Sequence, residues 1–293
     1  MNIRKGSEKE NSMGTDKQFR AIALDMDGTV LNDRKEIDED TAGALREALA
    51  AGREVLFCSG RCFAEMRDFV AMFQGMHYLI EANGAIVRDL GTGEVLFERH
   101  IPQEAVRELQ RIAGGRDILT QVFHRGNLYM PREDLKRLED FGMKVYEPFF
   151  RVLVKAVDDP LVYALEQDFS IEKINFYHTS EEDRQQTFSR FLQAGVQIEC
   201  VDAQAFSLEF SPPGIDKGTG LAQFSKVSGI PMEQIIMAGD SPNDLAAIEQ
   251  AGLGVAMGNA GDAVKRAADV VTEDNNHAGC AGIIRKYLLN TEQ

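Results

Sequence analysis

The sequence is short of basic residues, and this shortage limits the partners that the protein can bind. It contains 32 lysines and arginines against 47 aspartates and glutamates, so its formal net charge is -15. Nucleic acids and anionic membranes are bound through basic surfaces. We therefore expect neither nucleic acid nor membrane as a partner.

Long apolar segments are also absent. The sequence has no uninterrupted apolar run of the roughly 18 residues that a membrane-spanning helix needs. Residues 1–18 are polar, carry charges of both signs and lack the apolar stretch of a secretory signal. We predict no membrane span and a disordered tail over residues 1–18.

Cysteine is sparse, and its spacing excludes two common uses. Cys58, Cys62, Cys200 and Cys280 form no CxxC pair and no cysteine–histidine cluster with zinc spacing. Free thiols scattered through a well-cored chain are typical of a reducing compartment, so we expect a cytoplasmic protein. Cys58 is interpreted as a small apolar filler on a buried strand rather than as a nucleophile.

The chain is long enough for two domains. It has 293 residues, of which 44% are hydrophobic, and can therefore bury a sizeable core. An apolar stretch over residues 21–24 ends in two carboxylates, Asp25 and Asp27, followed by Gly28. This pattern predicts a buried parallel strand with charge at its carboxyl end, where open α/β sheets have their active sites.

The two acids can serve different purposes. Gly28 should break the strand, so that Asp27 splays away from Asp25. Asp25 could then attack an electrophile and bind a cation, while Asp27 handles protons. Two acids with this spacing and no other motif are more often a solvated acidic turn, so the interpretation depends on the other motifs.

Polar residues also follow the next two predicted strands. Ser59 could offer its hydroxyl to a phosphate oxygen, or could cap a helix, and the two roles are compatible. Asn83-Gly84 could be no more than a tight turn. Its position after the third strand also makes it a candidate for substrate contact.

Further candidates occur late in the chain. Lys217 begins a predicted helix after Pro212-Pro213-Gly214; such a lysine is usually a solvated charge. Asp240 and Asp244 are four positions apart and should face the same way if the turn is helical. Acids also favour helix starts, but hard oxygen ligands at two strand ends predict a magnesium site.

The spacing of these motifs places an inserted domain. Asp25 and Ser59 are separated by one βαβ unit, whereas Ser59 and Lys217 are separated by far more than one further unit requires. We expect the fold class α/β, with a Rossmann-like, doubly wound parallel sheet core over residues 19–84 and 209–293. Residues 85–208, beginning with a hairpin at 86–97 and including a helix at 131–140, should form an inserted α+β cap domain with an antiparallel sheet.

Four motifs follow one another along the chain in the order found in the haloacid dehalogenase (HAD) superfamily. They are Asp25-Met26-Asp27-Gly28-Thr29, Phe57-Cys58-Ser59-Gly60-Arg61, Lys217 and Gly239-Asp240-Ser241-Pro242-Asn243-Asp244. The resemblance extends from about Phe19 to the C-terminus. The sequence looks most like the Cof-type phosphatases, which implies a C2 cap of the αββ-repeat (C2B) type.

The resemblance implies a role for each matching residue. Asp25 would be the nucleophile and Asp27 the acid and base, while Ser59 and Lys217 would complete the catalytic set. Magnesium would be held by Asp25, Asp27 through its backbone carbonyl, Asp240 and Asp244. The implied phosphate and substrate contacts are Gly28, Thr29, Gly60, Asn83, Gly84 and Asn243.

We therefore expect a magnesium-dependent phosphatase that hydrolyses a small phosphorylated metabolite through an aspartyl phosphate. The alternatives are a phosphotransferase or phosphomutase with the same intermediate, and a regulator that binds a phosphorylated metabolite without turnover. The sequence does not distinguish a monomer from a homodimer. Candidate specificity residues on the cap are His124, Arg125, Asn175 and Tyr177, and candidate rim residues are Asp274 and His277.

Overall fold

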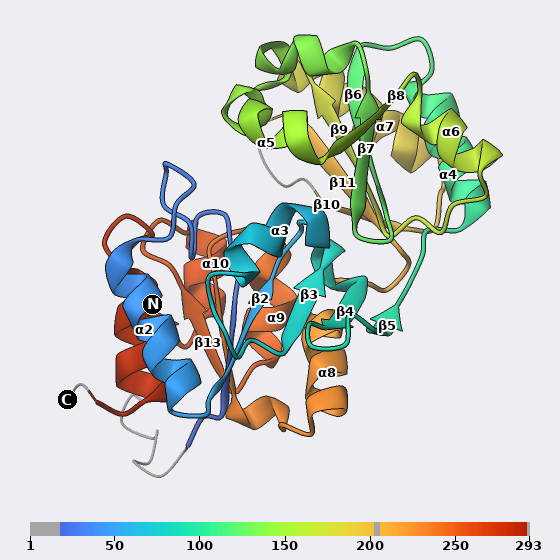
Figure 1. The fold of residues 1–293 in the computed structure, drawn as a ribbon. Helices are drawn as coiled ribbons and strands as arrows, with labels where there is room; N and C mark the ends of the chain where they lie inside the picture. Colours follow the sequence, from blue (N-terminus) through green and yellow to red (C-terminus); the bar gives the residue numbers. More distant parts are fainter. Residues whose placement is uncertain (1–17, 202–205, 292–293) are drawn as a thin grey trace, which may run out of the picture.

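The computed structural model describes residues 18–201 and 206–291, which form a larger and a smaller lobe (Figure 1). The predicted disordered tail lies outside the described residues except for Gln18. Among the residues described, no helix is both long enough and apolar enough to cross a membrane.

The larger lobe is built on an eight-stranded sheet with the order β14-β13-β12-β1-β2-β3-β4-β5. Its strands from β14 to β3 are parallel, and β4 and β5 are antiparallel to their neighbours. The bounds are β1 (Ala21–Leu24), β2 (Glu54–Cys58), β3 (Tyr78–Glu81), β4 (Ile86–Asp89), β5 (Val95–Glu98), β12 (Ile235–Gly239), β13 (Leu253–Ala256) and β14 (Val270–Val271).

Helices cover both faces of this sheet, and the central strand shows why. Along β1, Ile22 and Leu24 pack into the core on one face, whereas Ala21 and Ala23 pack on the other. All four are fully buried, as expected for a parallel strand covered on both sides. One face carries α2 (Glu39–Ala50), α3 (Phe63–Val70) and α11 (Gly279–Ile283) with the π-helical turn Ile284–Leu288, and the other carries α8 (Lys217–Ser228), α9 (Leu245–Gln250) and α10 (Asp262–Ala267).

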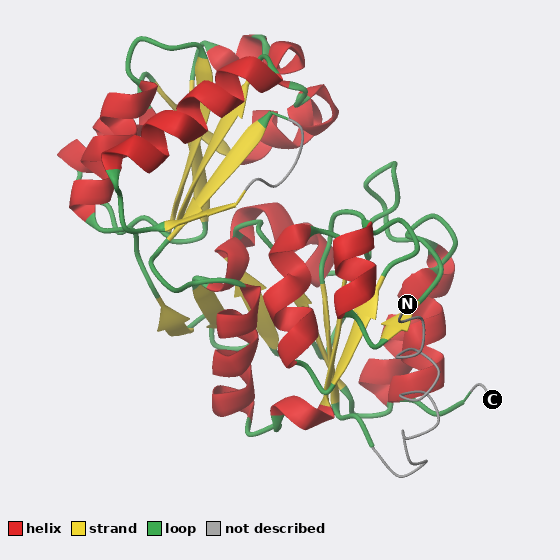
Figure 2. Ribbon diagram, turned by 180° about the vertical axis from the view of Figure 1, so that it is seen from behind, coloured by secondary structure: helices red, strands yellow, loops and turns green. Residues whose placement is uncertain are grey.

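The smaller lobe contains a six-stranded sheet with the order β10-β11-β9-β6-β7-β8. Its pairings are antiparallel except for β7 with β8, which is parallel. The strands are β6 (Ile118–His124), β7 (Asn127–Pro131), β8 (Val154–Val157), β9 (Lys173–His178), β10 (Glu199–Val201) and β11 (Ser207–Ser211). The two lobes confirm the predicted α/β class, with a Rossmann-like core and an inserted α+β cap (Figure 2).

The two faces of the cap sheet have different coverings. One face packs against α4 (Gln103–Ala113), α6 (Pro160–Glu166) and α7 (Glu181–Ala194). The other packs against α5 (Glu147–Leu153) and short 3₁₀ turns, and its apolar cluster includes Cys62 from the core lobe. This second face therefore meets the core.

The structure corrects the predicted beginning and end of the cap. The hairpin at 86–97, assigned to the cap from sequence, forms β4 and β5 and extends the core sheet from β3. At the other end, β11 continues to Ser211, beyond the predicted boundary at residue 208. Hairpin patterns show that two strands pair with each other, but do not show which sheet edge they join.

One predicted cap helix is also wrong. Residues 131–140 contain the 3₁₀ turns Asp134–Lys136 and Leu138–Phe141 instead of an α-helix. Arg137 between them has φ -133° and ψ 31°, which interrupts any continuous helix. The short elements α5 and β8 were not predicted, because neither is long enough to show a clear hydrophobic period.

Candidate active site

The carboxyl ends of three adjacent strands bring the motifs together. Asp25 follows β1, Ser59 follows β2 and Asp240 follows β12, and β1 lies between the other two strands. Lys217 enters the same region from the first turn of α8, whose N-cap is Asp216. The topology therefore gathers residues from both halves of the core.

Lys217 joins two of the acids. Its ammonium nitrogen lies 2.6 Å from Asp25 Oδ1 and 2.6 Å from Asp244 Oδ1. All three side chains are almost fully buried. Burial raises the pKa of Asp25 to about 8, against the opposing charge of Lys217. Burial alone would lower the pKa of Lys217, but Asp244 and Asp25 outweigh it and raise that pKa, so the lysine stays charged.

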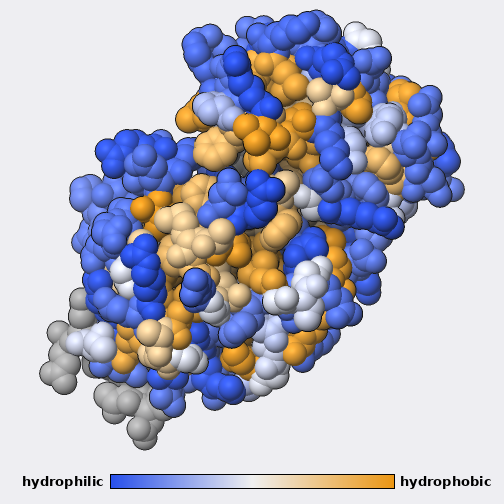
Figure 3. Space-filling view, in the orientation of Figure 1, coloured by the Kyte–Doolittle hydropathy of each residue, from blue (hydrophilic) through white to orange (hydrophobic). Residues whose placement is uncertain are grey.

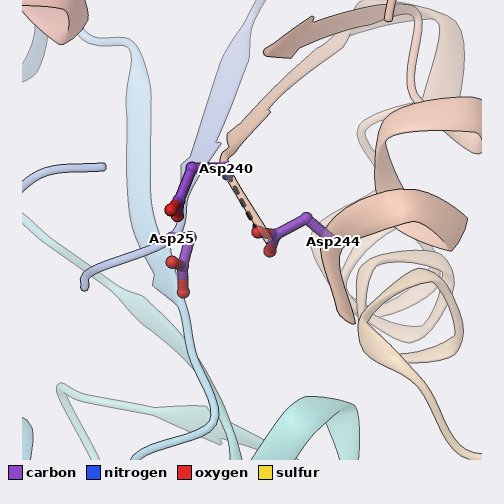
Figure 4. Close-up of side chains that lie close together, drawn as sticks. All are labelled: Asp25, Asp240 and Asp244. Carbon is purple, nitrogen blue, oxygen red and sulfur yellow. Dashed lines mark hydrogen bonds between the residues drawn. The ribbon is translucent and has the colours of Figure 1, made fainter. Parts of the chain in front are cut away.

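Asp240 completes an acidic triad with Asp25 and Asp244 (Figure 4). One carboxylate oxygen from each residue lies within 4.8 Å of the others. Burial and the neighbouring Asp244 raise the pKa of Asp240 to about 6. Three carboxylates lie near one lysine here, and hard oxygen ligands with excess negative charge fit a magnesium ion.

The loop around the triad is shaped by hydrogen bonds and by one glycine. Asp244 Oδ2 accepts hydrogen bonds from the backbone N–H groups of Asp240 and Ser241. Gly28 has φ +79°, and a Cβ there would lie 2.4 Å from Asp240 Oδ2. Thr29 donates a hydrogen bond from Oγ1 to Asp240 Oδ1 at 3.3 Å. Gly28 and Thr29, predicted to contact substrate, thus lie against a proposed metal ligand.

Asp27 points to a separate set of partners, in agreement with the predicted splaying of the two acids. It accepts two hydrogen bonds from Arg61, at 2.7 and 2.8 Å, and one from Lys35 at 2.8 Å. Tyr146 of the cap lies 3.4 Å away through its hydroxyl. Burial opposes ionisation, but Arg61 and Lys35 outweigh it and hold the pKa of Asp27 well below its usual range.

Arg61, Lys35 and Tyr146 were not identified from the sequence. Arg61 directly follows Ser59-Gly60, so its place beside a motif was a usable signal. Lys35 stands in a polar loop, and Tyr146 comes from the cap, so no sequence pattern links either residue to Asp27.

Ser59 and Gly60 line the cavity next to Asp25. Ser59 Oγ accepts a hydrogen bond from the N–H of Arg61 at 3.3 Å. The N-cap of α3 is Cys62, so Ser59 is not the cap of that helix. The carbonyl oxygen of Gly60 accepts a hydrogen bond from Lys173 of the cap at 3.0 Å.

Asn83 and Gly84 occupy different environments although they are neighbours. Asn83 Nδ2 donates to Glu209 Oε2 of the cap at 2.7 Å, and its Oδ1 accepts from Asn243 Nδ2 at 3.1 Å. Gly84 has φ +94° and packs on α8, where a Cβ would lie 2.1 Å from the carbonyl oxygen of Asp216. Asn243 lines the cavity beside Asp25, whereas Asn83 and Gly84 do not.

A cavity of about 120 Å³ lies between the core and the cap. Apolar surface is visible on the smaller lobe where it faces the larger one (Figure 3). The core contributes catalytic candidates, and the cap contributes polar and aromatic side chains. The lining includes Asp25, Asp27, Ser59, Arg61 and Asn243 of the core, and Gln121, Phe123, Tyr146, Lys173, Asn175, Tyr177 and Glu209 of the cap.

Only some of the predicted cap and rim residues reach this cavity. Asn175 and Tyr177 line it. His124 instead bonds the carbonyl oxygen of Ser170 and stacks on Phe169, outside the lining. Arg125 is exposed. Asp274 and His277 bond each other and are not among the residues that line the cavity.

Comparison with known proteins agrees with this geometry. Residues 22–284 match the model of the haloacid dehalogenase-like hydrolases. The chain belongs to this family of hydrolases. The putative phosphatase YxeH of Bacillus subtilis is 29% identical over 92% of this chain and 99% of its own. The 5-amino-6-(5-phospho-D-ribitylamino)uracil phosphatase YcsE of the same organism is 30% identical, over 94% of this chain and 98% of its own.

A solved structure shares the fold of this hydrolase. A haloacid dehalogenase-like hydrolase from Bacteroides thetaiotaomicron has a TM-score of 0.78 and 25% identity, covering 92% of this chain and 99% of its own. The family match and the phosphatase relatives together confirm the predicted Cof-type HAD hydrolase.

Proposed function

We propose that this hydrolase releases phosphate from a small phosphorylated metabolite in a magnesium-dependent reaction that proceeds through an aspartyl phosphate on Asp25. The observation that carries the proposal is the buried contact of Lys217 with Asp25 and Asp244, next to Asp240. A lysine and an acidic triad around one carboxylate suit a nucleophile that must approach an anionic substrate.

In the first step, Asp25 Oδ attacks phosphorus, and the bond from phosphorus to the leaving oxygen breaks. Lys217 orients Asp25 and offsets its repulsion from the phosphate. Ser59 through its hydroxyl and Asn243 through Nδ2, two residues that line the cavity, donate hydrogen bonds to the phosphate oxygens. Asp25, Asp240, Asp244 and the backbone carbonyl of Asp27 would hold a magnesium ion, whose charge would offset the negative charge of the transferred group.

Asp27 supplies and removes the protons. The leaving oxygen takes a proton from Asp27 in the first step. In the second step Asp27 takes a proton from the water that attacks phosphorus, and the bond from phosphorus to Asp25 Oδ breaks, which releases phosphate and restores Asp25. Arg61 and Lys35 hold Asp27 in its ionised form, which is the form that the second step needs. Protonation for the first step therefore requires these contacts to loosen.

The relatives suggest the size of the substrate. Their names include a phosphatase of a ribitylaminouracil phosphate and the pyridoxal phosphate phosphatase YbhA of Escherichia coli. A small phosphomonoester, such as a sugar phosphate, also suits a cavity of about 120 Å³. The four cysteines are all free thiols, which is compatible with a cytoplasmic enzyme.

The proposal is tested by phosphate release from a panel of sugar phosphates, nucleotides and small phosphoesters. Release should require magnesium, stop with a chelator and disappear in Asp25→Asn. Asp68→Asn, which changes an exposed carboxylate on α3, is the matched control and should keep full activity. Release that persists in Asp25→Asn would refute the assigned nucleophile, and phosphate transfer to an added sugar in preference to water would indicate a phosphotransferase.

A further inference from the structure

The cap wall of the cavity contains a row of polar side chains on neighbouring strands. Asn175 on β9 lies directly opposite Gln121 on β6 and, on its other side, directly opposite Glu209 on β11. All three residues line the cavity, as does Tyr177 two positions further along β9. Asn175 is therefore the central member of a polar row that faces the catalytic carboxylates across the cavity.

The amide of Asn175 is oriented by its neighbours. Its Nδ2 donates to Gln121 Oε1 at 3.1 Å and to Tyr177 Oη at 3.2 Å, which uses both of its protons. The residue is only 3% exposed, and its Oδ1 is buried and accepts no hydrogen bond from the described residues. A buried acceptor without a partner is costly.

A second acceptor in the same condition lies on the opposite wall. Asn243 Oδ1 of the core is buried and has no partner among the described residues, while Asn243 Nδ2 is bound to Asn83. Asn175 and Asn243 both line the cavity, one from each lobe. The cavity therefore offers two hydrogen-bond acceptors to a ligand that carries donors.

The charged residues of the lining disfavour a second anionic group on the ligand. Arg61 is paired with Asp27, and Lys173 is paired with Glu209 at 2.7 Å. Arg61 and Lys173 are the basic residues of the described lining, and the charge of each is already offset by a carboxylate. Glu65 adds a further acid to the lining. A second phosphate or carboxylate would meet acids without an uncommitted cation.

We propose that Asn175 is a specificity-determining residue whose Oδ1 accepts a hydrogen bond from a hydroxyl or N–H of the substrate's leaving group. The preferred substrate is then a monophosphate with an uncharged, donor-bearing leaving group rather than a bisphosphate or a phosphorylated acid. This inference rests on the proposed phosphatase function. Gln121 and Tyr177 are positioning residues, because they orient the Asn175 amide.

The test compares two kinds of substrate in Asn175→Ala. For the best sugar monophosphate of the panel, kcat/KM should fall about tenfold, as expected when one neutral hydrogen bond is lost. For p-nitrophenyl phosphate, whose leaving group carries no donor, kcat/KM should change by less than about threefold. Equal losses for both substrates would overturn the proposal, as would a wild-type preference for fructose 1,6-bisphosphate over the monophosphates.

Two further variants separate recognition from folding. Asn175→Asp retains an acceptor at the Oδ1 position, so it should keep the preference for the sugar monophosphate within about threefold. Gln197→Ala, which changes an exposed amide of the cap outside the cavity, should match the wild type. Loss of the preference in both Asn175→Asp and Gln197→Ala would show a general defect of the cap and contradict the assignment.

Binding measurements distinguish failure of this inference from failure of the phosphatase proposal. Calorimetry with Asp25→Asn should detect binding of the sugar monophosphate, and adding Asn175→Ala should weaken that binding about tenfold. If the wild type releases no phosphate but this weakening is observed, the phosphatase proposal fails and the recognition site stands. If phosphate is released and binding is unchanged by Asn175→Ala, the recognition site is wrong.

Discussion

Arg61 clamps Asp27 through two parallel hydrogen bonds, from Nε at 2.7 Å and from Nη2 at 2.8 Å. This planar pairing fixes the orientation of the carboxylate as well as its charge. It separates the two acids of the first motif, since Asp25 is held by Lys217 instead. The nucleophile and the proton carrier therefore have different environments although they are two positions apart.

Replacing Arg61 should affect substrates according to their leaving groups. Lysine cannot form two parallel hydrogen bonds to a carboxylate, so Arg61→Lys should lose the orientation of Asp27. We expect kcat/KM, which reports the first step, to fall about tenfold or more for a sugar phosphate, whose leaving oxygen needs a proton. The loss should be smaller for p-nitrophenyl phosphate, whose leaving group departs as an anion. Steady-state kinetics would check this, with Arg67→Lys on the exposed side of α3 as control. Equal losses of kcat/KM for both substrates would contradict the role of Asp27 as the acid of the first step.

Magnesium should stabilise the protein more strongly at high pH. The pKa values of Asp25 and Asp240 are raised from the ordinary 3.8 to about 8 and about 6, so the folded protein holds protons that the unfolded chain releases. The metal-free protein should therefore lose stability as the pH rises from about 4 to about 8. Metal binding requires ionised ligands, so the magnesium-induced rise in Tm should be larger at pH 8 than at pH 5.5.

Thermal unfolding with magnesium and with chelator at both pH values would measure this effect. Asp240→Asn should remove most of the magnesium-induced rise, whereas the exposed Asp158→Asn should leave it intact. A rise that is independent of pH, or that persists in Asp240→Asn, would argue against the acidic triad as the metal site.

Removing the Lys217 ammonium should destabilise the fold. Lys217→Met would leave the buried Asp25 and Asp244 without their shared cation. Breaking a buried pair in this way costs about 3–5 kcal/mol. The cost should be smaller at pH 5.5 than at pH 8, because Asp25 can be protonated there. Urea unfolding without magnesium would test this, with the exposed Lys226→Met on the same helix as control. A loss in the free energy of unfolding below about 1 kcal/mol in Lys217→Met would exclude Lys217 as the compensating charge.

Gly84 should matter for packing rather than for substrate binding. Gly84→Ala introduces a Cβ into the carbonyl oxygen of Asp216, whereas Gly93→Ala, also at positive φ, meets nothing within 4 Å. Gly93→Ala should cost about 1–2 kcal/mol from backbone strain alone, and Gly84→Ala about 1–3 kcal/mol more from overpacking. Denaturant unfolding would measure both costs. Under conditions in which Gly84→Ala is fully folded, its KM should equal that of the wild type. A raised KM under those conditions would show that Gly84 contacts the substrate.

The sequence alone was sufficient for the parallel strands of the core sheet and for the main motifs. The apolar stretch before Asp25 predicted a strand buried on both faces, and β1 has fully buried residues on both faces of the sheet. Because the carboxyl ends of adjacent parallel strands meet at one edge, Asp25, Ser59 and Asp240 were expected together. Burial and hydrophobic periodicity are properties of short segments, so they can be predicted from the sequence.

Other features depended on tertiary structure. The pattern at 86–97 predicted a hairpin but not its pairing with β3, since either lobe could have provided the sheet edge. Likewise, Gly84 belonged to a plausible turn motif, yet the proximity of α8 gives it a packing role. Such contacts depend on which surfaces meet in the folded protein, and the spacing of residues along the sequence does not show this.

The amino-acid sequence by itself determined the family, the α/β core, the presence of an insert and the acids at the strand ends. Only the tertiary structure decided the partners of those acids and the composition of the cavity. Tyr146 reaches Asp27, and Asn175 lies across the cavity from Asp25, because the folded cap meets the core at the site. Strand ends are fixed by local hydrophobic pattern, whereas contacts between lobes arise from the packing of surfaces formed by distant segments.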